Sequence, residues 1–141
     1  MKGPVKATRA ELDRWLARTA FNAYFRFRVR KVGAGDCTIE APFRDEFERP
    51  GGTVSGPVFM AAADVAIWLA VATRRGTKER WVTADLKTAF LRAAHREPFT
   101  CTARLLKIGR QLAYAVAECK RRDGTPLTHH TAIYVRVPDS S

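Results

Sequence analysis

Asp64 is the one charged residue between Arg49 and Arg74, and it lies inside the most apolar stretch of the chain. Its neighbours at helical spacing are Met60, Ala61, Ile67 and Trp68. Placing a carboxylate among such neighbours costs several kcal/mol unless the charge is paired or neutralised. The pattern favours a functional carboxylate, either a general base or a nucleophile. The alternative is a structural carboxylate that faces a crevice and accepts hydrogen bonds from backbone amides.

A helix N-terminus precedes this stretch, with the sequence Thr53-Val-Ser-Gly-Pro57. Ser55 or Gly56 suits the cap, and Pro57 suits the first helical turn. The free N–H groups and positive dipole of such a terminus can hold a carbonyl oxygen as it becomes an oxyanion. Glycine at position 56 lets a ligand approach the backbone closely. An oxyanion site and an ordinary cap are both open interpretations of this motif.

The spacing of Gly56 and Asp64 constrains how they can act together. Eight residues separate them, which is about 12 Å along a helix at 1.5 Å per residue. Both groups must lie about 3 Å from one reacting centre to cooperate. One helix cannot supply both, so a shared site requires Asp64 from a neighbouring subunit.

Periodicity predicts an α+β fold in one domain over residues 1–141. The capping-box spacing of Thr8 and Glu11 predicts a helix over about residues 8–20, within an N-terminal helical segment of residues 1–22. The apolar stretch predicts a central helix over residues 57–74 that is buried on all sides. Alternating patterns predict strands over residues 24–32, 37–43, 81–91, 99–108, 112–120 and 127–137, with a loop over 44–56. This order predicts an antiparallel sheet wrapped around the central helix.

The charge balance indicates a polyanionic partner. The formal net charge is +11, with a pI near 10.3, which suits nucleic acid, acidic lipid or a small phosphorylated ligand such as coenzyme A. The basic clusters fall at expected turns and element ends, not along one helix. A solvated surface is therefore favoured over a nucleic-acid-binding face.

The remaining composition points to a cytoplasmic protein without a metal centre. Three widely spaced cysteines give neither a disulfide framework nor a zinc motif. Charged residues interrupt the first twenty positions, and no apolar run suits a membrane span. His129 and His130 would point to opposite faces of a strand, so they cannot chelate one metal together. No nicotinamide or ATP motif is present.

Several segments carry a family resemblance. The run from Arg49 to Asp64, Arg-Pro-Gly-Gly-Thr-Val-Ser-Gly-Pro-Val-Phe-Met-Ala-Ala-Ala-Asp, resembles the start of the central helix in hotdog-fold acyl-coenzyme A thioesterases. The PaaI-like group, in the 4-hydroxybenzoyl-coenzyme A thioesterase superfamily, is the most similar. Its members typically read Asn-x-x-Gly-x-x-His-Gly-Gly before an apolar stretch that ends in Asp or Glu. The segment Val82–Ala94, the sequence Lys107-Ile-Gly-Arg110 and the Asp123-Gly124 turn are also similar, so that the resemblance covers most of residues 24–137.

The resemblance implies hydrolysis of an acyl-coenzyme A thioester without a cofactor, at the subunit interface of a homodimer or a dimer-of-dimers tetramer. By position, Asp64 matches the catalytic carboxylate and Gly56 the oxyanion donor. Thr83 matches a position that orients water, although threonine is also common in any strand. No nucleic acid or membrane partner is implied.

The chain also departs from the family pattern. Ser55 stands in place of the histidine, Pro57 in place of the second glycine, and Arg49 in place of the asparagine. We expect Ser55 and Arg49 to contact the substrate, and basic residues to contact the coenzyme A phosphates, namely Arg74, Arg75, Lys78 and Arg110. Alternatives are an acyl-coenzyme A-binding protein without activity and, less favoured, a hydratase or dehydratase, which would need a histidine beside the carboxylate.

Overall fold

The central helix is α3 (Gly56–Arg75), and its boundaries follow from local sequence. Ser55 is the N-cap and Pro57 occupies the first turn, where its missing N–H costs no helical hydrogen bond. Gly76 ends the helix with φ at 81°, a conformation that glycine adopts without strain. The predicted central helix is confirmed, with one residue added at each end.

α3 is buried on most of its surface but not on all of it. Twelve of its residues are buried, and α3 is the core helix of the domain, although its length and composition alone would allow a membrane span. One stripe at helical spacing stays partly open, formed by Met60, Ala61, Asp64 and Trp68. The expectation of burial on all sides was therefore wrong for this stripe, which the described elements of the chain cover only in part.

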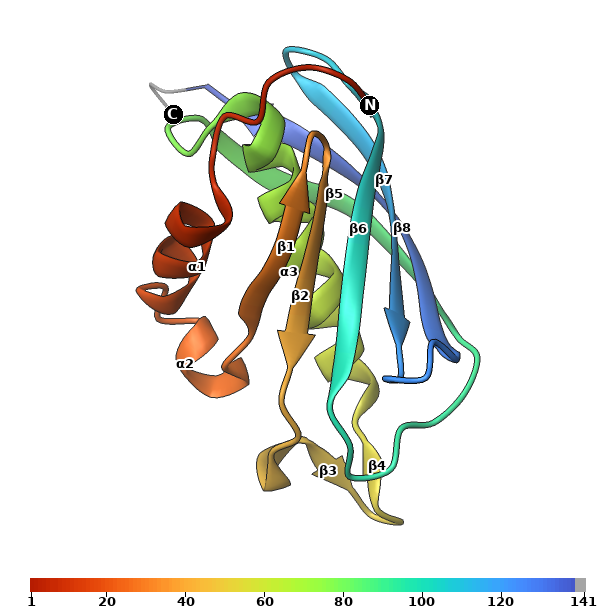
Figure 1. The fold of residues 1–141 in the computed structure, drawn as a ribbon. Helices are drawn as coiled ribbons and strands as arrows, with labels where there is room; N and C mark the ends of the chain where they lie inside the picture. Colours follow the sequence, from red (N-terminus) through yellow and green to blue (C-terminus); the bar gives the residue numbers. More distant parts are fainter. Residues whose placement is uncertain (139–141) are drawn as a thin grey trace.

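An antiparallel sheet wraps α3 in the order β1-β2-β6-β7-β8-β5 (Figure 1). The structure describes residues 1–138. The six strands of this sheet are β1 (Arg28–Gly33), β2 (Asp36–Ala41), β5 (Arg80–Phe90), β6 (Phe99–Ile108), β7 (Leu112–Lys120) and β8 (Pro126–Val137). Residues facing α3 are mostly small or apolar, such as Ala103, Ala115 and Ala132. Small side chains let the sheet approach the helix closely.

Two deviations from the predicted elements have local causes. The strand expected from residue 24 begins at Arg28, because α2 (Asn22–Phe25) occupies the preceding residues. The Asn22 side chain holds this turn by accepting from the Phe27 N–H and donating to the Phe27 carbonyl. The predicted loop over residues 44–56 contains a 3-10 helix (Asp45–Phe47) and a small hairpin of β3 (Glu48–Arg49) and β4 (Thr53–Val54).

The N-terminal helix, α1 (Arg9–Ala17), packs beside β1 and ends before the predicted boundary. Thr8 caps it by accepting from the Glu11 N–H, as the capping-box spacing predicts. The Asp13 carboxylate accepts from the β1 backbone at Val29 and pairs with Arg28 at 2.8 Å. These bonds fix α1 against the sheet.

The two edge strands of the sheet, β1 and β5, differ in whether another element of the chain lies beside them. β1 is covered by α1, whereas β5 pairs with β8 on one side and has no strand on the other within residues 1–138. β5 is eleven residues long and exposes Val82 and Phe90, at 43% and 56%. A long, partly apolar edge strand is a template for pairing with another chain.

Candidate active site

Two strands bring hydroxyl groups to the Asp64 carboxylate. Asp64 projects from the middle of α3, while Thr83 on β5 and Tyr134 on β8 are direct cross-strand partners. The Thr83 hydroxyl donates to Asp64 Oδ1 at 2.5 Å. The Tyr134 hydroxyl also donates to Oδ1 and lies 2.7 Å from the Asp64 backbone carbonyl. The structure thus brings Asp64 and Thr83 into contact, whereas the role expected of Thr83, orienting water, stays a prediction.

A β-bulge in β5 makes this arrangement possible. The register between β5 and β8 shifts between Thr83 and Asp85. Side chains alternate along a strand, so Thr83 and Leu86, three residues apart, would ordinarily face opposite sides of the sheet. Their partners Tyr134 and Ala132 on β8 are both buried and so lie on the face toward α3. The bulge adds one residue to β5, which lets Thr83 and Leu86 face α3 as well.

The two hydroxyl donors leave one carboxylate oxygen available. Both converge on Oδ1, and no donor among residues 1–138 reaches Oδ2. Burial raises the pKa of the Tyr134 hydroxyl well above its usual range, and the neighbouring Asp64 charge adds to this effect. Tyr134 therefore remains protonated and a donor at neutral pH. The two hydrogen bonds therefore restrain the carboxylate through Oδ1 and leave Oδ2 without a donor among the described residues.

Asp64 opens into a pocket of about 320 Å³. The carboxylate is half-buried, not enclosed in the core. The lining is mostly apolar and aromatic, formed by Leu16, Thr19, Phe21, Val65, Trp68, Trp81 and Val82 together with Asp64, Thr83 and Tyr134. Such a lining excludes water around a ligand and strengthens the few polar contacts within it.

Gly56 lies in a different pocket, of about 360 Å³. It shares that pocket with Arg49 and with Phe90 of β5. A Cβ atom at position 56 would lie 3.1 Å from Phe90 Cε1, so a side chain there would crowd the ring. In the first turn of α3, Pro57 has no N–H and the Val58 N–H bonds the Ser55 carbonyl at 3.0 Å, while the Ser55 side chain makes no capping hydrogen bond. Gly56 and Asp64 of one chain are therefore separate, as the helix spacing requires.

The predicted phosphate-binding residues lie near the C-terminal end of α3 and on the turn between β6 and β7. Arg74 donates to the Lys2 carbonyl, and Lys78 is exposed. Arg75 is occupied by an ion pair with Glu79 at 2.8 Å. Hydrogen bonds from Arg75 lower the pKa of Glu79 to about 2, with smaller contributions from Trp81 and Arg136. The Arg75 guanidinium is thus paired with a carboxylate of its own chain, so it is less available to a coenzyme A phosphate than the prediction assumed.

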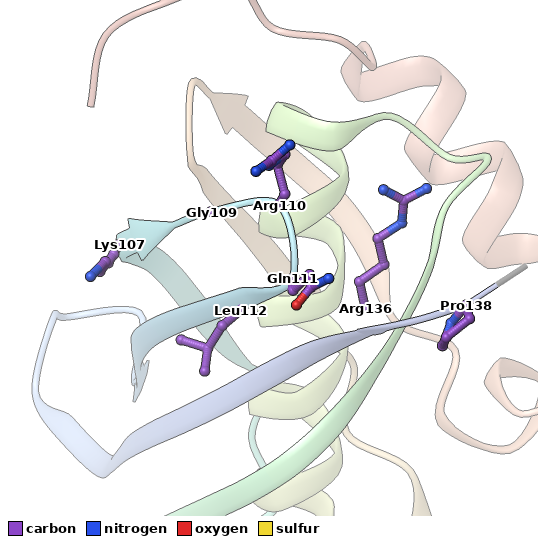
Figure 2. Close-up of a pocket in the computed structure, with 7 residues that line it drawn as sticks. All are labelled: Lys107, Gly109, Arg110, Gln111, Leu112, Arg136 and Pro138. Atoms are coloured by element: carbon purple, nitrogen blue, oxygen red, sulfur yellow. The ribbon is translucent and has the colours of Figure 1, made fainter.

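Arg110 lines a larger pocket of about 800 Å³ (Figure 2). Figure 2 shows Lys107, Arg110 and Gln111 around the turn between β6 and β7, with Arg136 on the nearby end of β8. Arg136 also pairs with Glu79 at 3.2 Å. Three cationic side chains at one concave surface favour an anionic ligand.

The histidines have structural or surface positions. His129 is exposed and His130 is fully buried, which confirms that they face opposite sides of β8. The His130 ring bonds the Thr88 hydroxyl at 2.8 Å and the Thr128 hydroxyl at 2.7 Å. Among residues 1–138, no group of three or more His, Cys, Asp or Glu side chains could hold a metal ion.

Comparison with known proteins identifies the family. Residues 51–128 match the sequence pattern of the thioesterase superfamily. The chain belongs to the thioesterase superfamily. A protein of Saccharolobus solfataricus, provisionally named an esterase, is 32% identical over 97 residues, 69% of either chain.

Solved structures of other thioesterase-superfamily proteins share the hotdog fold. A thioesterase of Haemophilus influenzae superposes with a TM-score of 0.86 at 16% identity, covering 96% of this chain and 95% of the other. The phenylacetic acid degradation protein PaaI of Thermus thermophilus gives a TM-score of 0.76 at 21% identity, covering 84% and 100%. The predicted hotdog fold is confirmed. Membership of the superfamily, with the esterase names of the relatives, indicates a hydrolase of thioesters or esters.

Tyr134 is the site residue that the sequence analysis missed. Its contact with Asp64 depends on the register between β8 and β5 and on how the sheet packs on α3, neither of which a single sequence reveals. A partial signal was available: alternation along β8 puts Tyr134 on the same face as His130 and Ala132, and a tyrosine on a buried face needs a hydrogen-bond partner.

We expect Tyr134→Phe to lower kcat of a thioester substrate about tenfold and to leave KM within about twofold. The lost hydrogen bond to a charged group is worth about 1.5 kcal/mol, which corresponds to this factor in rate. Tyr134 is a positioning residue, so the loss should appear in kcat. Tyr114→Phe, at an exposed tyrosine of β7 outside the pocket, is the matched control. A raised KM with unchanged kcat would contradict this role.

Proposed function

We propose that this protein hydrolyses acyl-coenzyme A thioesters. The observation that carries the proposal is the Asp64 carboxylate, with Oδ1 held by two hydroxyl groups and Oδ2 open to an apolar pocket. Oδ2 can take a proton from water as the water oxygen attacks the thioester carbonyl carbon. The C–S bond then breaks, and the proton passes to the coenzyme A thiolate. Direct attack by Oδ2, giving a mixed anhydride that water hydrolyses, is equally compatible.

The oxyanion donor in this proposal is Gly56 of the partner subunit. A two-fold antiparallel pairing of β5 with its copy lays the Thr83 end of one strand beside the Phe90 end of the other. Thr83 contacts Asp64, and Phe90 lies beside Gly56 in the second pocket. The same pairing would join the Asp64 pocket of one chain to the Gly56 pocket of the other. Arg49, which lines the Gly56 pocket, would reach the substrate in the same way.

Two surfaces of the chain support this homodimer. No strand among residues 1–138 pairs with the outer edge of β5, and the open stripe of α3 leaves Met60 at 38% exposure. Pairing would remove both from water. We propose a homodimer as the smallest active unit, with a dimer of dimers as the larger form.

We propose coenzyme A as the thiol part of the thioester substrate, because a pocket with basic side chains lies at the turn between β6 and β7. Arg136 is two residues from Tyr134 on β8, a step of about 7 Å along a strand. The extended arm of coenzyme A can span that distance, and its phosphates suit Lys107 and Arg110. The three cysteines are free and buried, which suits a reducing cytoplasm.

The strongest alternative is an acyl-coenzyme A-binding protein without hydrolytic activity. Ser55, in place of the family's histidine, is the observation that favours it. A hydratase is disfavoured because the His130 ring bonds Thr88 and Thr128, and no histidine among residues 1–138 bonds Asp64.

We expect Asp64→Asn to lower the rate of acyl-coenzyme A hydrolysis by at least about a hundredfold, as expected for loss of a base or nucleophile. The fold should persist, because an asparagine Oδ1 can still accept from Thr83 and Tyr134. Asp85→Asn is the control, since Asp85 is exposed on the same strand. The assay is thiol release from short, medium, long and aromatic acyl-coenzyme A. Wild-type activity in Asp64→Asn would contradict the mechanism, and a wild type that binds but never hydrolyses would establish the alternative.

We expect Lys107→Ala and Arg110→Ala each to weaken binding of coenzyme A about threefold to fivefold, the effect of one exposed charge contact of up to 1 kcal/mol. Binding by the wild type should weaken as salt rises. Calorimetric titration at low and high salt measures both effects. Arg122→Ala, at the opposite turn of the sheet, is the control. Equal weakening by all three variants would contradict a localised phosphate site, and nanomolar sequence-selective DNA binding would contradict the coenzyme A assignment.

A further inference from the structure

The pocket beside Asp64 has walls from two parts of the chain. The helix α3 and strands β5 and β8 supply the wall that carries the carboxylate. The opposite wall comes from the end of α1 and the residues before α2, namely Leu16, Thr19 and Phe21. These three lie outside residues 51–128, the part that matches the superfamily pattern. The N-terminal wall therefore lies outside the part of the chain that the superfamily pattern describes.

The side chains that line the pocket favour an apolar acyl group. Beyond the hydroxyl and carboxylate groups at Asp64 and the indole N–H groups of Trp68 and Trp81, the Thr19 hydroxyl is the one polar side-chain group in the lining. It donates its proton to the Trp15 carbonyl at 3.0 Å. Charged or strongly polar acyl groups would lose their hydration here without gaining partners.

The N-terminal wall is held rigidly. The Trp15 ring of α1 packs on the Trp68 ring of α3, with centroids 4.1 Å apart. Leu12 and Leu16 are buried beneath them, and Asp13 ties α1 to β1. Phe21 is the exception, because 52% of it is exposed at the rim while its ring lies 4.8 Å from Phe25. The wall thus has a fixed base and an exposed aromatic rim.

We propose that the segment of residues 16–21 limits the length of the acyl group. Within one chain the pocket has about 320 Å³, room for about ten non-hydrogen atoms at roughly 30 Å³ each on the Asp64 side of the proposed dimer site. The preferred substrates are accordingly apolar acyl groups of up to about that size, either medium straight chains or single aromatic rings. This inference rests on the proposed function and assigns to it a substrate class and the residues that set it.

The test is a chain-length profile of kcat/KM over straight-chain acyl-coenzyme A from two to sixteen carbons, with benzoyl- and phenylacetyl-coenzyme A as aromatic members. We expect a maximum between about six and ten carbons and a fall of at least tenfold by sixteen. Each methylene that the pocket buries adds about 0.8 kcal/mol, close to fourfold, up to the optimum. Beyond it, further methylenes are forced against the N-terminal wall, and this crowding lowers kcat/KM. Aromatic members should match the medium chains.

The decisive variant is Phe21→Ala, which removes an exposed rim side chain and should not disturb the fold. We expect it to raise kcat/KM for chains of twelve to sixteen carbons at least about tenfold relative to eight carbons, and to leave four-carbon substrate within about threefold. Tyr24→Ala is the matched control, because Tyr24 is an exposed aromatic residue of the adjoining helix α2 and does not line the pocket. It should leave the profile unchanged.

A binding measurement separates this inference from the proposed function. Quenching of tryptophan fluorescence in Asp64→Asn reports acyl-coenzyme A binding without turnover, because Trp68 and Trp81 line the pocket. Affinity should follow the same chain-length order. A wild-type optimum at fourteen carbons or more, or an unchanged profile in Phe21→Ala, would overturn the length limit while leaving hydrolysis intact. If the wild type hydrolyses none of these substrates but its affinity follows the expected order of chain lengths, the proposed function is overturned and the length limit stands.

Discussion

The fixed distance along α3 between Gly56 and Asp64 determines how a site can be built on this fold. A straight helix keeps its first turn and its middle about 12 Å apart. α3 is packed into the core along most of its length, so it has no freedom to bend the two groups together. Their pockets share no lining residue. In the proposed mechanism the Asp64 carboxylate and the Gly56 N–H must therefore come from two chains, which would pair along the edge of β5 that no described strand covers.

The carboxylate is supported by hydroxyl groups, with no cation bonded to it among residues 1–138. Tyr134 and Thr83 reach Asp64 from neighbouring strands, and the bulge in β5 aims Thr83 at the helix. Hydroxyl donors satisfy one oxygen without neutralising the charge, whereas an arginine would hold both oxygens. The support therefore stabilises a half-buried carboxylate and leaves Oδ2 without a donor among residues 1–138, which suits the role of base or nucleophile that we propose.

Much of this structure could be predicted from local sequence signals. The Pro57 start of α3 and the Asp123-Gly124 turn each depend on neighbours in the chain, and both predictions are confirmed. The functional role of Asp64 stays a prediction. The features that were missed depend on contacts between distant segments. Tyr134 depends on strand register, and the occupation of Arg75 depends on its fold-back to Glu79. The N-terminal wall of the pocket was missed for the same reason.

Subunit complementation tests the shared site most directly. One chain carries Asp64→Asn, and the other carries Gly56→Val, whose side chain would crowd Phe90. Each variant alone should be inactive. Equal mixing makes about half of the dimers mixed, with one of two sites restored, so activity should approach about a quarter of the wild-type value. Absence of recovery, with mixed dimers shown to be present, would contradict a site that combines Gly56 and Asp64 of two chains.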